Sequence, residues 1–238
     1  MIMKYLLIIL FVIIGFSSCL NNIKNEDKRV FKQDKSLIDS VLTKSEAVLS
    51  NKNHQISKIG NSIGVIVLTE KITKNDTIKI YNKDGSLWHM FTYYYDDSDG
   101  KYDFYNEEFR PFSFHPDYFL LALKVTDDVG DSYRVVVNES EGLKKFLRKT
   151  NHSLKFQTWE EHILSLFSVG FNYDKNIIKT SPNNESESIK YDSDEFYHPS
   201  QIKGKWLQVK WGSEGSWNYG WIKWREKEKL LIELFYFA

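Results

Sequence analysis

The chain has 238 residues, with 32 basic residues balancing 32 acidic ones, and a single cysteine. This balance creates no net field that would draw the protein onto nucleic acid or onto an anionic membrane surface. One cysteine cannot form a disulfide within the chain, so stability has to come from packing, for which the 16% of aromatic residues supply material.

The N-terminus combines a short positive start, an apolar run and an ending of small residues. Lys4 supplies the charge, residues 5–16 are apolar, and Ser17, Ser18 and Cys19 close the segment. A run of about 12 residues is too short to span a hydrocarbon core roughly 30 Å thick, but it has the length of the apolar part of a signal peptide. A plain secretory signal and a buried first element are the alternative interpretations.

This pattern resembles a bacterial lipoprotein signal peptide, and the richness in Asn, Lys, Ile and Tyr resembles proteins of the Bacteroides–Flavobacterium type. The resemblance implies that residues 1–19 are a leader and that Cys19 carries fatty acyl chains such as palmitate. It also implies a protein of the cell envelope, anchored through lipidated Cys19 to a membrane, with the outer membrane favoured, and facing the periplasm or the cell surface. Phe16 departs from the family, which prefers Leu there. The rest of the chain is long enough for one large or two small domains.

Residues 20–35 are polar and aperiodic, which predicts a flexible tether. Residues 36–49 carry apolar side chains at helical spacing behind a capping-box-like start, so we expect a short amphipathic helix. From residue 63 the apolar period changes to two, which predicts consecutive strands joined by short turns in an antiparallel meander. The expected strands are 64–70, 76–81, 86–95, 101–105, 118–126 and 133–138.

Two more helices are expected, at residues 140–149 and 159–167. Basic residues gather late in the first of them, at 144–149, and Glu160 and Glu161 open the second. Acidic residues at the start of a helix and basic residues near its end both stabilise the helix through its dipole. We therefore expect a solvated helix end at the cations rather than a site for lipid headgroups, and helix capping by the glutamates rather than catalysis.

A tryptophan-rich block closes the chain and resembles a bacterial Src-homology-3-like domain over residues 171–238. Ile177-Ile-Lys-Thr-Ser-Pro182 matches the opening strand and turn of that family, Gly204-Lys-Trp-Leu-Gln-Val209 its middle strand, and Gly220-Trp-Ile-Lys-Trp224 its close. The resemblance implies a small β-barrel used for binding, often of peptidoglycan or peptides. The Pro-Ser-x-x-Tyr corner of eukaryotic members is missing, so recognition of Pro-rich peptides is not expected.

The expected fold class is α+β, mostly β. An antiparallel meander with a few helices makes a first domain at residues 36–168, and a small Src-homology-3-like β-barrel follows at residues 171–238. A polar loop at 183–188 lies inside the second domain, and an apolar strand at 230–237 ends it.

Aromatic side chains anchor interfaces and the surfaces that bind sugars or peptides. The candidate ligand-binding residues are therefore the aromatic residues of the block, Trp206, Trp217, Tyr219, Trp221 and Trp224. Strand alternation predicts that Trp206 lies on the exposed side of its strand. It also predicts that Trp221 and Trp224, three residues apart, face opposite sides, one of them in the core. Trp217 and Tyr219 are expected in a polar hairpin loop.

No catalytic signature stands out elsewhere. The six histidines lack metal-ligand spacing, and an acylated Cys19 leaves no thiol for a cysteine peptidase, so we expect neither a metal nor a cofactor. The acidic segment 96–103 fits a hairpin turn better than a calcium loop. The sequence favours a non-enzymatic binding or scaffold module for cell-wall peptide or an envelope protein, with no nucleic acid partner. The alternatives are an inhibitor or immunity lipoprotein that binds a secreted toxin, and a hydrolase that uses carboxylates of the first domain.

Overall fold

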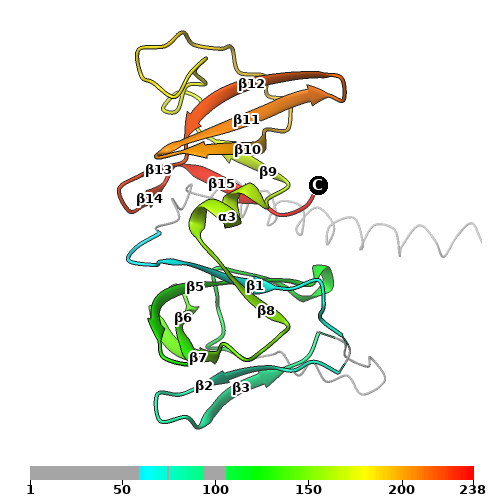
Figure 1. Ribbon diagram of the computed structural model, residues 1–238, viewed down its shortest axis with the longest axis vertical. Helices are drawn as coiled ribbons and strands as arrows, with labels where there is room; N and C mark the ends of the chain where they lie inside the picture. Colours follow the sequence, from blue (N-terminus) through cyan, green and yellow to red (C-terminus); the bar gives the residue numbers. More distant parts are fainter. Residues whose placement is uncertain (1–58, 74, 94–105) are drawn as a thin grey trace, which may run out of the picture. The chain divides into compact units, whose positions relative to one another are not determined.

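The computed structural model describes residues 59–73, 75–93 and 106–238, which belong to one compact unit. The described chain is mostly β, with antiparallel strand pairs and little helix, as the expected α+β, mostly β class requires (Figure 1). Cys19, the tether, the predicted first helix and the predicted strand after residue 100 lie outside the described residues. No described helix is long and apolar enough to cross a membrane.

The first part of the described chain forms an eight-stranded sheet with strand order β3-β2-β7-β6-β5-β1-β8, in which β4 also pairs with β5. A short 3-10 helix, η2 (Pro116–Tyr118), connects β4 to β5. The strands are β1 (Gly64–Leu68), β2 (Ile78–Tyr81), β3 (Leu87–Phe91), β4 (Ser113–His115), β5 (Leu120–Val129), β6 (Ser132–Asn138), β7 (Leu143–Arg148) and β8 (Leu154–Gln157).

The predicted meander is confirmed for the β2-β3 and β5-β6 hairpins but is wrong for β1. Strand β1 pairs with β5 and β8 instead of β2. The reason lies in its composition, because a strand that is apolar on both faces needs cover on both. Val65 belongs to one apolar cluster and Ile66 to another, so β1 sits inside the sheet with a core on either side.

The predicted helix at 140–149 is also wrong, since most of this segment is strand β7, paired with β6 and β2. Gly142 has a φ of +67° in the turn that enters the strand. Leu143 and Leu147 turn toward the core, and Phe146 lies on the opposite face, opposite Arg134 and Tyr81 in the register. A spacing of three and four residues reads as a helix in sequence, but tertiary pairing overrides that preference.

The second part of the described chain contains one short helix and three small sheets: β10-β11-β12, β13-β14 and β15-β9. Helix α3 confirms the predicted helix at 159–167 in shorter form. None of the sheets in the described residues closes into a barrel. The elements are α3 (Trp159–Leu164), β9 (Ser168–Phe171), β10 (His198–Lys203), β11 (Trp206–Ser213), β12 (Ser216–Lys223), β13 (Arg225–Glu226), β14 (Lys229–Leu230) and β15 (Ile232–Phe235).

Helix α3 starts with a full capping box. The Thr158 hydroxyl accepts a hydrogen bond from the Glu161 backbone N–H, and the Glu161 carboxylate accepts one from the Thr158 backbone N–H. These two bonds satisfy backbone donors that a helix start leaves unpaired. The hydrogen bonds that the Glu161 carboxyl accepts from the Thr158 backbone and hydroxyl lower its pKa. The capping role expected for Glu161 is confirmed. The neighbouring Glu160 forms an ion pair instead, with its Oε1 at 3.7 Å from Arg225 Nη2.

Two apolar clusters fill the described unit. One lies among the strands of the large sheet and includes Phe91 and Leu121. The other joins β1 and α3 to the C-terminal strands, with Val65, Trp159 and Trp224 among its members. The predicted domain boundary near residue 170 stays a prediction, and this second cluster contains side chains from both sides of it.

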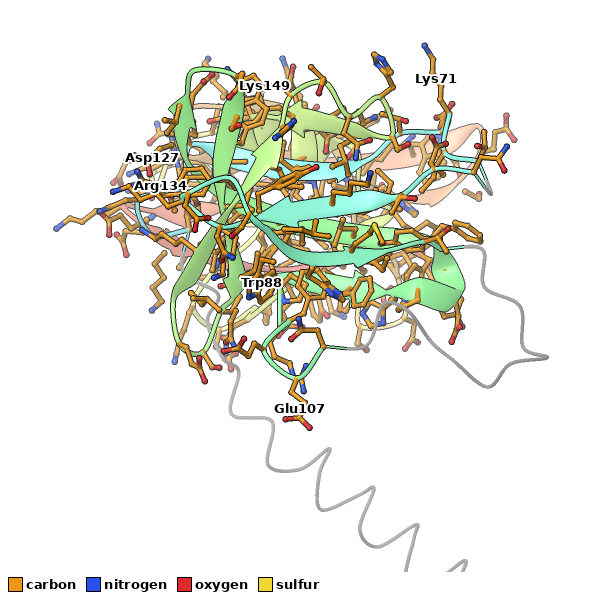
Figure 2. The ribbon with its side chains drawn as sticks, turned by 90° about the horizontal axis from the view of Figure 1, so that it is seen from below. Lys71, Trp88, Glu107, Asp127, Arg134 and Lys149 are labelled. Atoms are coloured by element: carbon orange, nitrogen blue, oxygen red, sulfur yellow. The ribbon has the colours of Figure 1, made fainter. Side chains whose placement is uncertain are left out.

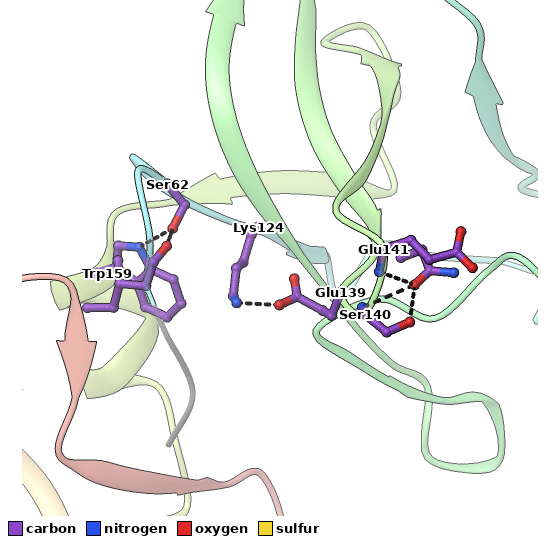
Figure 3. A network of polar contacts seen from close by, with 8 residues as sticks. Ser62, Lys124, Glu139, Ser140, Glu141 and Trp159 are labelled. Atoms are coloured by element: carbon purple, nitrogen blue, oxygen red, sulfur yellow. Dashed lines mark hydrogen bonds and ion pairs between the residues drawn. The ribbon is translucent and has the colours of Figure 1, made fainter. Parts of the chain in front are cut away.

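A polar network accompanies the second cluster (Figure 3). Buried Lys124 on β5 forms an ion pair with Glu139 and lies 4.7 Å from the ring centroid of Phe112. The Trp159 indole N–H donates to the Ser62 hydroxyl at 3.1 Å. A buried ammonium costs free energy unless it is paired, so this ion pair allows a lysine inside the sheet.

Candidate functional site

The sheet β10-β11-β12 has one face in the core and one face turned outward. Leu207, Val209 and Trp211 alternate along β11 and belong to the second apolar cluster, as predicted. Gly220 on β12 faces the same way, because a Cβ there would lie 2.3 Å from the Ile178 side chain. The residues between these positions therefore form the opposite, outer face.

The strand register arranges the outer face in three rows. Across β10, β11 and β12, the rows are His198, Lys210 and Tyr219, then Gln201, Gln208 and Trp221, then Lys203, Trp206 and Lys223. Each row holds at least one aromatic ring, two rows hold lysines, and none holds a carboxylate. We call these nine residues, together with Trp217 of β12, the outer face.

A chain of ring contacts extends the outer face toward β9. The ring of Phe167 lies 5.5 Å from Phe196 and 5.1 Å from His198. His198 in turn lies 6.0 Å from Trp217, edge to face. His198 Nδ1 donates to the carbonyl oxygen of Phe167 at 2.6 Å, which fixes the ring orientation. Phe196, at one end of this aromatic strip, is 58% exposed, and Tyr219, two residues from Trp217 on the same face of β12, is 50% exposed.

Two lysines of the outer face rest on tryptophan rings. Lys210 Nζ lies 4.6 Å from the ring centroid of Trp217, and Lys223 Nζ lies 5.5 Å from that of Trp206. Neither lysine forms an ion pair with a carboxylate of the described residues. A cation held on an aromatic ring stays available to an incoming anion, so the outer face offers ring surfaces and positive charge side by side.

Hydrogen bonds from a buried tyrosine hold the loop that precedes Phe196. The buried Tyr197 hydroxyl accepts a hydrogen bond from the Asp192 backbone N–H at 2.9 Å and donates to its carbonyl oxygen at 3.1 Å. Burial raises the pKa of the Tyr197 phenol above its ordinary value. Since Tyr197 faces inward, strand alternation turns Phe196 and His198 outward.

The structure separates the five candidate residues predicted from sequence. Trp217 and Tyr219 lie on the outer face, but on strand β12 rather than in a loop. Their hairpin has a tight turn at Glu214 and Gly215, whose φ is +87°, so pairing continues up to Ser213 and Ser216. Strand geometry holds both aromatic side chains more firmly than a loop would.

The three other candidates are buried. Trp206 has the predicted face but is only 8% exposed, so the expectation of an exposed tryptophan there is wrong, and its cross-strand neighbour is Lys223. Trp221 is on the outer face and similarly covered, while Trp224 is in the core, where its indole N–H donates to the Gly204 carbonyl. The prediction that the last two face opposite sides is confirmed.

Sequence reasoning missed Phe167, Phe196 and His198. The alternation in Phe196-Tyr197-His198 could have indicated the first and third residues. In a strand, a buried central residue such as Tyr197 turns both neighbours outward. Phe167 gave no such signal, since it joins the strip only after the chain folds back from α3.

Carboxylates and histidines elsewhere do not converge in the described residues. No group of three or more His, Cys, Asp or Glu there could hold a metal ion. The hydrolase alternative requires two carboxylates facing each other in a pocket. A hollow of about 340 Å³ beside β2 and β7 contains one, Asp76, which accepts hydrogen bonds from the Thr73 backbone and hydroxyl. The acidic segment 96–103 lies outside the described residues.

Comparisons with known proteins give no relative. No family model matches the chain, and no curated protein or solved structure matches it either.

Proposed function

We propose that the protein is an envelope lipoprotein, anchored through Cys19, whose outer face binds cell-wall peptide without catalysing a reaction. The observation that carries this proposal is a set of aromatic rings on one surface. The ring of Trp217, covered by Lys210, contacts His198, which contacts the exposed ring of Phe196, and the exposed Tyr219 lies two residues from Trp217 on the same face of β12. Large aromatic side chains are normally buried, and a strip of them held open on a strand is typical of a binding surface.

The charge of the outer face supports a ligand with carboxylates. Its rows contain Lys203, Lys210 and Lys223, and no acidic residue. Stem peptides of the cell wall carry free carboxylates and alkyl groups next to sugar rings. Lysine ammonium groups would pair with the carboxylates, and the aromatic rings would cover the apolar parts.

Strand connectivity supports a Src-homology-3-like arrangement for residues 171–238. The strand that precedes this segment, β9, pairs with the last strand, β15, and the sheet β10-β11-β12 is an antiparallel meander between them. Lys179 exchanges backbone hydrogen bonds with Trp221 and so covers the outer edge of β12. We therefore propose a Src-homology-3-like order of strands for this segment, with open sheets in place of a closed barrel and with the outer face as the ligand surface.

Co-sedimentation of the detergent-solubilised full chain with purified cell-wall sacculi tests the proposal. The variant F196S/Y219S removes two exposed rings and leaves the core intact. We expect it to bind about tenfold more weakly or worse, since truncating exposed anchor residues typically costs more than 1 kcal/mol each. Equal binding by both proteins, or no binding by the native chain, contradicts the proposal.

A matched control is the ring pair of Tyr118 in η2 and Phe237 after β15, neither of which belongs to the outer face. Tyr118 is 66% exposed and stacks at 4.5 Å on the exposed ring of Phe237. The variant Y118S/F237S removes two exposed rings with similar chemistry, and we expect it to co-sediment like the native chain. If it loses binding equally, the outer face is not specific.

The exposed pair Tyr118 and Phe237 also favours a second candidate, an inhibitor or immunity lipoprotein that docks a secreted protein. Stacked, solvent-exposed aromatic rings are common anchors of protein interfaces. This candidate predicts a complex of fixed stoichiometry with a secreted toxin, measured by light scattering after size exclusion. Y118S/F237S should weaken that complex while F196S/Y219S leaves it intact, and the reverse pattern contradicts it.

A further inference from the structure

The polar hollow beside β2 and β7 lies where β2 begins and β7 ends. Its volume is about 340 Å³, within the range of small-molecule sites. The side chains that line it include Asp76, Thr77, Lys79, Tyr81, Arg148 and Asn151. They come from both strands and from the turn after β7, so the site is built by tertiary structure and not by one loop.

Two cations face each other across this hollow. Tyr81 is the Cα partner of Phe146 in the antiparallel pair of β2 and β7. Two residues away on each strand, beyond this pair, Lys79 and Arg148 lie on the same face, and both line the hollow. The Arg148 guanidinium lies 4.6 Å from the ring centroid of Tyr81, which fixes its plane. Like charges directly opposite each other in a sheet are destabilising unless something compensates them.

The described chain supplies no carboxylate partner for either cation. Two other basic residues of the sheet do form ion pairs: Arg134 pairs with Asp127 at 3.3 Å, and Lys149 pairs with Asp128. Figure 2 shows Arg134 beside Asp127, its partner in the β5-β6 hairpin. The sheet thus neutralises these neighbouring cations and leaves Lys79 and Arg148 uncompensated within a hollow.

Neutral donors complete the lining. The Asn151 side-chain amide donates to the Thr77 carbonyl at 3.4 Å, which ties the turn after β7 to the start of β2. An amide carries two N–H donors, so the second can serve a ligand. Asp76 is turned toward the Thr73 backbone and hydroxyl, whose hydrogen bonds lower the pKa of its carboxyl and keep the negative charge engaged there.

We propose that this hollow binds a phosphate monoester. A planar guanidinium, an ammonium, hydroxyl groups and an amide converge there, and together they match the several acceptor oxygens and double charge of a phosphate better than the two oxygens of a carboxylate. The volume leaves room for a polyol or sugar group beyond the phosphate. The ligand occupies the space between Lys79 and Arg148 and removes their mutual repulsion.

Isothermal titration of the detergent-solubilised full chain with glycerol 3-phosphate tests the site. We expect saturable binding that R148Q or K79Q weakens about tenfold or more, as for loss of a charge-assisted hydrogen bond. Lys144 lies on the same face of β7, four residues from Arg148 and outside the hollow, so K144Q is the matched control and should bind as the native chain does. No binding by the native chain, or an equal loss in K144Q, overturns the proposal.

Thermal unfolding separates loss of the site from loss of the fold. Without ligand, K79Q should be at least as stable as the native chain, because it removes a like-charge contact. Glycerol 3-phosphate should raise the unfolding temperature of the native chain and not that of K79Q. If sodium acetate at the same ionic strength stabilises the native chain equally, the site is not selective for phosphate and the proposal fails.

The phosphate can belong to a soluble metabolite or to a lipid headgroup. Titration with dihexanoyl phosphatidate below its micellar concentration distinguishes the two. Affinity equal to that for glycerol 3-phosphate assigns a soluble ligand, and tighter binding that R148Q abolishes assigns a lipid. Binding of the short-chain lipid that R148Q leaves unchanged counts against the site.

Discussion

His162 is a buried base held between two polar partners. Its Nδ1 lies 3.0 Å from the Gln157 side-chain oxygen, and its Nε2 lies 3.0 Å from the Tyr236 hydroxyl. Burial lowers the pKa of His162 to about 4, and burial also raises the pKa of Tyr236. Both groups are therefore neutral at pH 7, and together they connect α3 to the segment after β15.

The lowered pKa predicts acid destabilisation in a defined pH range. The unfolded chain takes up a proton near pH 6.5 that the folded chain refuses until about pH 4, so the free energy of unfolding is full above pH 6.5 and falls as the pH drops toward 4. The loss should reach roughly 3 kcal/mol. Urea unfolding at a series of pH values measures it, and H162Q should flatten the slope in this range.

Carboxyl groups act in a lower range and provide the contrast. Hydrogen bonds lower the pKa of Asp76, Asp84 and Glu161 from ordinary values near 4, so the stability that they contribute is lost as the pH falls below about 4. H162Q should leave that lower part of the profile unchanged. An H162Q profile parallel to the native one between pH 6.5 and 4 rules out the buried histidine as the cause.

At the scale of elements, the position of the outer face depends on close packing between β12 and Ile178, in the segment between β9 and β10. A Cβ at position 220 would lie 2.3 Å from Ile178 Cγ2 and 3.2 Å from the Trp211 ring. G220A should therefore lower the free energy of unfolding by about 1–3 kcal/mol, the usual cost of overpacking a core. Removing the clashing methyl in I178A should make the double variant less destabilised than the sum of the single ones, as measured by urea unfolding. Full additivity would mean that the two residues do not touch.

The sequence predicts strands well where the apolar period is two and the turns are short. The hairpins β2-β3 and β5-β6 and the alternation of Leu207, Val209 and Trp211 are of this kind. It fails at β7, because Leu143, Phe146 and Leu147 fit a helical stripe as well as a strand with one outward ring. Only the pairing with β2 and β6 decides between them, and pairing is not written in local spacing.

The residues of the candidate site could likewise be predicted only where local sequence determines their exposure. Trp217 and Tyr219 could be predicted because aromatic residues beside glycine and serine are hard to place in a core. Phe167 could not, since its neighbours on the outer face come from a strand about thirty residues later in the chain. The opposition of Lys79 and Arg148 is equally invisible, because a predicted helix at 140–149 put the arginine in solvent.

At the scale of the whole molecule, the balanced total charge conceals two local excesses of positive charge. The outer face of β10-β11-β12 carries lysines among aromatic rings, and the hollow between β2 and β7 carries two facing cations. No carboxylate of the described residues forms an ion pair with these cations. Both sites suit a protein held at a surface rich in carboxylates and phosphates, as the anchor predicted at Cys19 implies.

Site-specific photo-crosslinking in cells that produce the protein tests the central claim most directly. A benzophenone amino acid replaces Tyr219 on the outer face, and in a second strain it replaces Tyr118, which is more exposed, as a control. The account predicts that position 219 yields covalent adducts with cell-wall stem peptides, identified by mass spectrometry after muramidase digestion, and that position 118 does not. Adducts with a single secreted protein at position 118, and none with the wall at position 219, would contradict the proposed wall binding and support the inhibitor alternative.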